Sequence, residues 1–182
     1  MPRAGLTPVA VVDAALELLD AGDSAPTLAA VAGHVGVAAP SLYKHVPGAS
    51  GLRQLVALRV LGELTEKLRA AATGRSGDDA IAALLHAWRD YVLAHPHRYA
   101  AMPVQPLGDP DLARAASGML DVVLAVLAGY GLTGQDAIHA TRRIRAAAHG
   151  FATLEAQGGF GLAEDASESY QGLIDMITAS LQ

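Results

Sequence analysis

Four side chains in the middle of the chain have the chemistry of metal ligands: His86, Asp90, His95 and His97. The last two flank Pro96, which interrupts the helical pattern, and the chain has no Glu-x-x-His pair of the kind that holds metals in helical bundles. No serine stands in a nucleophile-elbow motif. The glycines of residues 158–161 lack the strand and the lysine of a phosphate-binding loop. The sequence therefore predicts no metal, no cofactor and no catalytic residue.

The composition indicates a globular protein that buries much of its surface. Of the 182 residues, 52% are hydrophobic and 17% are charged, which excludes a disordered chain. The absence of cysteine excludes disulfides, thiol catalysis and Cys-ligated zinc. We expect a cytoplasmic protein that does not enter the membrane, because the residues after Met1 lack a signal-like apolar stretch and no run of about 18 apolar residues is free of charges.

The net charge of −5 is concentrated in one part of the chain. Residues 1–62 hold four basic and four acidic residues, whereas residues 63–182 hold nine and fourteen. Lys44, Arg53 and Arg59 follow the last acid of the N-terminal part. This distribution is a weak electrostatic footprint for a protein that binds nucleic acid.

Binding chemistry is concentrated in residues 27–46, where the pattern predicts two short helices, 28–35 and 39–46. Thr27 suits the N-cap of the first, Ala32 gives a small residue where the helices cross, and Gly36 allows positive φ in the turn. Five apolar residues would pin the second helix to the first: Val31, Val35, Val37, Leu42 and Val46. A plain helical hairpin within a bundle core is the alternative interpretation.

The second of these helices would present Ala39, Pro40, Ser41, Tyr43 and Lys44 outward. We expect this face to enter the major groove of DNA, with Tyr43 and Lys44 reaching phosphates. Because three of the exposed residues are Ala, Pro and Ser, few bidentate contacts with bases are possible. The sequence therefore predicts modest base specificity.

Helical periodicity continues through the rest of the chain, and no segment alternates with the period of a strand. Helices are expected at about 8–21, 50–72, 79–94, 98–102, 110–130, 134–156 and 163–181, with Asp78 capping the third of these. We therefore expect an all-α protein of about nine helices. Residues 1–48 would form a three-helix DNA-binding domain and residues 49–182 a ligand-binding and dimerisation bundle.

The segment Gly36-Val37-Ala38-Ala39-Pro40-Ser41-Leu42-Tyr43-Lys44-His45-Val46-Pro47 resembles the signature of TetR-family transcriptional regulators, and residues 7–60 follow the family's order of helices. The resemblance implies that Thr27, the residues from Ala39 to Ser41, and Tyr43, Lys44 and His45 contact DNA. The chain departs from the signature at Ala38, where a capping Ser is usual, at Val46, where Phe is usual, and at Ala49, where a phosphate-binding Lys is common.

Two segments of the C-terminal part resemble one TetR subgroup, the Trp-His-Gly class. These are His95-Pro96-His97-Arg98-Tyr99-Ala100-Ala101-Met102 and His149-Gly150-Phe151-Ala152-Thr153-Leu154-Glu155, although the Trp is missing. Trp88, Tyr91, Tyr99 and Met102 belong to helices that enclose the ligand cavity in the family, and they are also ordinary core residues. His149 either lines a pocket or forms a hydrogen bond within the core.

In the family, the last two helices of each subunit form the interface of a homodimer. Gly150 in mid-helix is typical of close approach by another helix, and Ala146 and Thr153 fall on the same side. Leu173, Ile174, Met176, Ile177 and Leu181 form a stripe on the last helix, which an intramolecular core would also explain. We expect a repressor that a small-molecule effector releases from its operator. The alternative is a small-molecule-binding dimer with a weakened or lost DNA-binding head.

Overall fold

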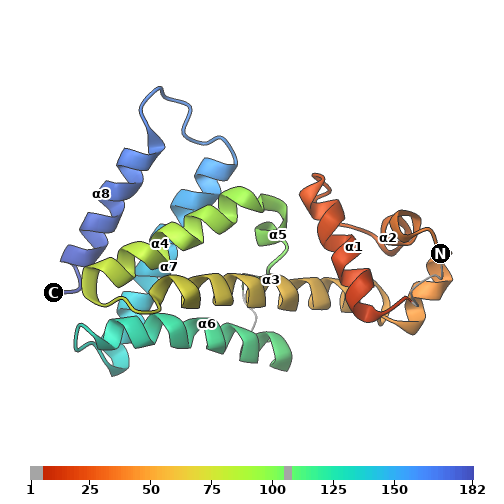
Figure 1. Ribbon diagram of the computed structural model, residues 1–182, viewed down its shortest axis with the longest axis horizontal. Coiled ribbons are helices and arrows are strands. Elements are labelled where there is room, and N and C mark those ends of the chain that lie inside the picture. The colour runs from red at the N-terminus through yellow and green to blue at the C-terminus, as the bar shows by residue number, and fades with distance from the viewer. Residues whose placement is uncertain (1–5, 105–107) are drawn as a thin grey trace. The chain divides into compact units, whose positions relative to one another are not determined.

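The computed structural model describes residues 6–104 and 108–182, and in these residues it contains helices and no strand (Figure 1). The elements are α1 (Pro8–Asp20), α2 (Leu28–Val35), the 3-10 helix η1 (Ala39–Lys44), α3 (Gly48–Ala72), α4 (Gly77–Ala94), α5 (Pro96–Ala100), α6 (Pro110–Ala128), α7 (Gly134–Ala156) and α8 (Ala166–Ala179). The expectation of an all-α fold is confirmed. Arg3, counted above among the basic residues, and the rest of residues 1–5 lie outside the described part.

The chain forms two compact units that are not consecutive in sequence. The first contains the chain up to Leu61 together with His97–Ala113, and the second contains Gly62–Pro96 with Arg114–Gln182. Helix α3 therefore belongs to both units, and the segment from His97 to Ala113 returns to the first. The expected boundary between a DNA-binding domain, residues 1–48, and a ligand-binding domain, residues 49–182, stays a prediction.

The first helices of the first unit begin and end where their capping residues predict. Thr7 Oγ1 accepts a hydrogen bond from the backbone N–H of Ala10, and Thr27 Oγ1 accepts one from Ala30, both at 3.1 Å. Each bond satisfies one of the unpaired amides at a helix start. Gly36 ends α2 with φ 73°, a left-handed conformation in which a side chain would be strained. The turn between α2 and η1 therefore depends on this glycine.

The second helix of this pair is a 3-10 helix and ends at Lys44, whereas the sequence predicted a helix over residues 39–46. Ala38 occupies its N-cap and has no side-chain oxygen to accept a hydrogen bond from the first turn. The segment forms the tighter i→i+3 bonds that are common in helices of only a few residues.

Helix α3 begins at Gly48, two residues before the predicted start. The Pro47 ring lies over its first turn, so that a Cβ atom added at Gly51 would come within 2.3 Å of Pro47 Cγ. A rigid proline ring cannot move aside as a flexible side chain can. Only glycine therefore fits at position 51 while Pro47 stays in place.

In the second unit, α4 packs against both α7 and α8 (Figure 1). Arg89 of α4 forms two hydrogen bonds with the Glu155 carboxylate of α7, at 2.7 and 2.5 Å, and both side chains are largely buried. The Arg89 guanidinium also lies over the Tyr170 ring, 5.1 Å from its centroid. Its hydrogen bonds with Glu155 raise the pKa of Arg89.

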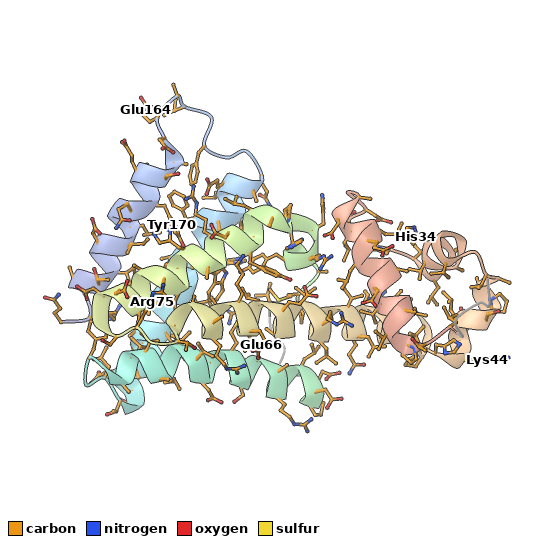
Figure 2. The ribbon with its side chains drawn as sticks, viewed as in Figure 1. His34, Lys44, Glu66, Arg75, Glu164 and Tyr170 are labelled. Carbon is orange, nitrogen blue, oxygen red and sulfur yellow. The ribbon has the colours of Figure 1, made fainter. Side chains whose placement is uncertain are left out.

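Tyr170 joins α8 to the same cluster. Its ring is completely buried, and its hydroxyl donates a hydrogen bond to the Leu85 carbonyl at 2.6 Å (Figure 2). Burial raises the pKa of this phenol well above its usual range. Hydrogen bonds and aromatic packing thus hold α4, α7 and α8 together.

One cap in this unit differs from the prediction. Helix α4 begins at Gly77 with Ser76 at its N-cap, so Asp78 lies within the first turn. There its carboxylate accepts a hydrogen bond from the Tyr130 hydroxyl at 2.6 Å, which ties the turn after α6 to the start of α4. Asp78 therefore binds Tyr130, which is distant in the sequence, instead of capping α4 as predicted.

Candidate nucleic-acid interface

The residues predicted to contact DNA lie at the start of α2 and on or directly after η1, and we call them the reading surface: Thr27, Ala39, Pro40, Ser41, Tyr43, Lys44 and His45. Beneath it, Leu42 and Val46 are almost completely buried with Val31 and Ala32. Anchored in this way, η1 leaves Tyr43 63% exposed and Lys44 exposed at the outer edge of the unit (Figure 2). Pro40 and Thr27 are exposed, and Ala39, Ser41 and His45 are half-buried.

The acidic side chains of residues 6–61 are already paired within the unit. Asp13 forms an ion pair with Arg59 at 3.1 Å, Glu17 contacts His34 Nε2 at 2.6 Å, and Asp20 accepts two hydrogen bonds from Arg98. Asp23 accepts a hydrogen bond from the backbone N–H of Ala25 at 3.0 Å. All four acids between residues 6 and 61 therefore have partners within the unit.

Two basic side chains of the same stretch, unlike those acids, have no recorded partner in the described residues. Lys44 and Arg53 have no recorded ion pair or hydrogen bond within the described part of the chain. Their charges are therefore available to an external anion. Sequence reasoning gave a net charge of zero for this region and missed the pairing, because Arg98 lies 78 residues from Asp20.

The expected effector residues are divided between the two units. Trp88 and Tyr91 are buried in α4, and His149 is exposed on α7. The Tyr91 hydroxyl donates to Glu63 at 3.0 Å. Tyr99 is buried and Met102 half-buried, both in the first unit. Their role in binding an effector remains a prediction.

The expected dimer stripe on the last helix is largely part of the chain's own core. Ile174, Ile177 and Leu181 are almost completely buried, so that prediction is corrected for these three residues. Met176 is 60% exposed and Leu173 is half-buried. Both follow Gly172 on α8.

Gly150 lies in the middle of α7, and a Cβ atom added there would meet no atom within 4 Å in the described chain. The same holds for Gly172 on α8. Among the described residues, therefore, no other helix makes the close approach at Gly150 that the sequence led us to expect. The described residues contain no group of three potential metal ligands, and none of their helices is long and apolar enough to cross a bilayer.

Residues 81–177 match the family model described as "Tetracyclin repressor-like, C-terminal domain". The HTH-type transcriptional regulator Rv0681 of Mycobacterium tuberculosis is 39% identical over 158 residues, which cover 85% of this chain and 72% of the relative. The HTH-type transcriptional regulator YobS of Bacillus subtilis is 35% identical over 170 residues, which cover 92% of this chain and 88% of the relative.

Solved structures share the fold. A TetR variant from Acinetobacter baumannii AYE, solved in complex with minocycline, superposes with a TM-score of 0.73 at 18% identity, over 96% of this chain and 96% of the other. At this identity the likeness concerns the fold. This structure shares the all-helical fold, and the two relatives are named as HTH-type regulators.

Proposed function

Because the chain belongs to the TetR family of DNA-binding transcriptional regulators, we propose that it acts in the cytoplasm as a homodimeric repressor that a small molecule releases from its operator. The observation that carries the proposal is the reading surface. Buried Leu42 anchors η1, while its neighbours Tyr43 and Lys44 are exposed. No catalytic residue is proposed.

Charge supports DNA as the ligand of this surface. Lys44 is exposed on η1 with no recorded partner in the described residues, while the acids of α1 are paired with other side chains of the unit. A lysine in this position neutralises a phosphate and releases condensed counterions. Pro40 and Ala39 offer apolar contact to thymine methyl groups rather than bidentate hydrogen bonds. We therefore expect phosphate contacts to dominate the affinity.

Fluorescence anisotropy with a duplex from the region upstream of the chain's own gene tests this proposal. Lys44→Ala should weaken binding and reduce the slope of log affinity against log salt by about 1, and Tyr43→Ala should weaken binding at every salt concentration. Lys67→Ala is the matched control, because Lys67 is an exposed lysine of α3 outside the reading surface. If Lys44→Ala and Lys67→Ala bind DNA equally, the orientation of η1 is wrong.

The alternative of a weakened DNA-binding head rests on two observations. Ala38 provides no capping hydrogen bond to η1, and the exposed position 49 carries Ala rather than a cation. A gel shift at low salt, where phosphate contacts are strongest, separates the two functions. Absence of any shift with the upstream duplex would favour the alternative.

The effector is proposed to bind in the second unit near Trp88, Tyr91 and His149. Trp88 is the only tryptophan of the chain, so its fluorescence reports on α4 directly. A compound that changes this fluorescence should also weaken DNA binding, since the two sites are thermodynamically linked. A compound that binds without changing the DNA affinity would argue against release as the mechanism.

The homodimer is proposed to form through α7 and α8. Gly150 and Gly172 leave open space where another helix can approach closely, and Met176 is an exposed apolar side chain one turn after Gly172 on α8. Gly150→Leu should convert the dimer to a monomer in sedimentation equilibrium without a clash inside the chain. Gly118→Leu is the matched control, because Gly118 of α6 also has no atom within 4 Å of its Cβ position. Equal behaviour of the two variants would exclude this interface.

A further inference from the structure

We propose that the first unit contains a small-molecule site of its own, which binds an apolar monocarboxylate through Arg53. The site is separate from the effector cavity proposed for the bundle and does not depend on it. It lies entirely within the unit that carries the reading surface.

The site is a cavity of about 320 Å³. Its walls come from α1, the loop before α2, the first turns of α3 and the residue that follows α5: Ala15, Leu19, Ser24, Ala25, Pro26, Thr27, Ala49, Leu52, Arg53, Val56 and Ala101. Ala15 and Leu19 are completely buried, and Leu52 and Val56 are 2% and 5% exposed. The inner wall of the cavity is therefore apolar, while Ser24, Ala25, Thr27, Ala49 and Arg53 form an exposed rim.

Polar groups are confined to three of the lining residues. Arg53 provides five N–H donors, and it has no recorded partner in the described residues. The Ser24 hydroxyl likewise has no recorded hydrogen bond within residues 6–104 and 108–182. Thr27 Oγ1 accepts from Ala30, which leaves its hydroxyl hydrogen available to donate.

These groups select the charge of the ligand. No acidic residue lines the cavity, so its only formal charge is the positive charge of Arg53. A planar guanidinium binds a carboxylate through two parallel hydrogen bonds. One cation among apolar walls matches one carboxylate on an apolar body rather than a multiply charged phosphate.

The volume of the cavity limits the size of the ligand. A cavity of about 320 Å³ holds roughly ten groups of the size of a water molecule, at about 30 Å³ each. Octanoate has eight carbon and two oxygen atoms and is therefore a suitable probe. Octanamide has the same number of heavy atoms but no charge, and it serves as the matched control ligand.

The position of the cavity links its occupancy to the reading surface. Thr27 both lines the cavity and caps α2, the helix against which η1 packs. Ala101 follows α5, whose Arg98 is hydrogen-bonded to Asp20 at the end of α1. A ligand held here contacts two segments that position the helix-turn-helix.

The test uses the full chain, octanoate and ¹³C-methyl NMR, with titration calorimetry for the affinity. Octanoate should shift the methyl signals of Leu19, Leu52 and Val56 and leave those of Leu127, a core residue of α6, unchanged. Arg53→Gln and octanamide should each weaken binding at least about tenfold, the cost of losing a charge-assisted hydrogen bond. Arg53→Lys should retain part of the affinity. Arg142→Gln, which removes an exposed arginine of α7, should bind octanoate as the unaltered chain does.

A second variant fills the cavity without removing charge. Ala25→Leu adds bulk to an exposed loop residue of the wall and should abolish the octanoate-induced shifts. If this variant fails to fold, the Arg53→Gln comparison decides alone. The proposal is overturned if octanoate leaves the three methyl groups unchanged, or if Arg53→Gln and Arg142→Gln bind it equally. It is also overturned if Arg53→Gln weakens only DNA binding, because Arg53 would then be a phosphate contact.

Discussion

In the first unit the acids of α1 are paired, while Lys44 and Arg53 have no recorded partner in the described residues. In the second unit, by contrast, the largely buried Arg89 contacts side chains of two other helices. Arg89 holds Glu155 through two hydrogen bonds and covers the Tyr170 ring. One unit thus keeps cations in water for an external anion, and the other uses a cation to join helices.

The difference teaches that net charge is a poor guide to a binding surface. A sum over residues gives the N-terminal part no net charge, yet its acids are paired within the unit while Lys44 of the reading surface has no recorded partner in the described residues. A charge available for binding costs little when it stays hydrated, whereas a buried charge is tolerated only with a partner. The following predictions test this contrast, beginning with the largest expected effect.

Removal of the buried cation should affect the second unit most. Arg89→Ala leaves the largely buried Glu155 carboxylate without its partner, which should lower the free energy of unfolding by about 1.5–3 kcal/mol. Urea unfolding followed by Trp88 fluorescence measures this change. The double variant Arg89→Met with Glu155→Met should recover most of the loss, because it removes both charges. A loss below about 1 kcal/mol for Arg89→Ala would mean that the pair behaves as a surface ion pair.

High pH should also destabilise the second unit. Burial raises the pKa of Tyr170, and burial with the hydrogen bond to Asp78 raises that of Tyr130. Unfolded tyrosine loses its proton near pH 10 while the folded chain retains it. Stability is therefore fully present below that pH and falls as the pH rises further.

A pH series of urea unfolding checks this expectation. Tyr170→Phe should lower stability at pH 7 by about 1–2 kcal/mol, because the Leu85 carbonyl loses its donor, and should flatten the decline above about pH 10. Tyr43→Phe is the control, since Tyr43 is exposed in the first unit. Equal slopes for the two variants would show that Tyr170 does not cause the decline.

A smaller effect should appear in the first unit when η1 receives a cap. Ala38→Ser supplies a side-chain oxygen at the N-cap and should stabilise this helix by about 0.5–1 kcal/mol. Hydrogen exchange of the His45 amide, which bonds to the Leu42 carbonyl at 2.8 Å, should slow by the corresponding factor. Unfolding seen by Trp88 should not change. Faster exchange at His45 would mean that the 3-10 geometry cannot use the cap.

The sequence predicted the fold well where local chemistry decides the outcome. Thr27 and Gly36 mark the limits of α2 because a cap and a left-handed turn depend on single residues. Over six residues, however, a period of 3.6 cannot be distinguished from a period of 3.0, so the 3-10 form of η1 was not predictable from spacing. The missing cap at Ala38, in contrast, was expected from the sequence and is found in the structure.

Long-range pairing accounts for most of what the sequence did not show. No periodicity relates Arg98 to Asp20 or Asp109 to Gln54, yet these contacts attach the segment from His97 to Ala113 to the first unit. Asp109 does have a local signal, because its carboxylate also caps α6. The residues of the reading surface were predicted from their types and order, and their contacts with DNA remain predictions.

The contact between Pro47 and Gly51 constrains the order in which this region can change in evolution. A Cβ atom at position 51 would overlap the proline ring, so a lineage must replace Pro47 before it can acquire any side chain at position 51. The reverse order passes through a chain in which the first turn of α3 is displaced, and with it the helix that follows the reading surface. Among related sequences, proline at the first position should therefore occur together with glycine at the second, whereas glycine at the second does not require proline at the first.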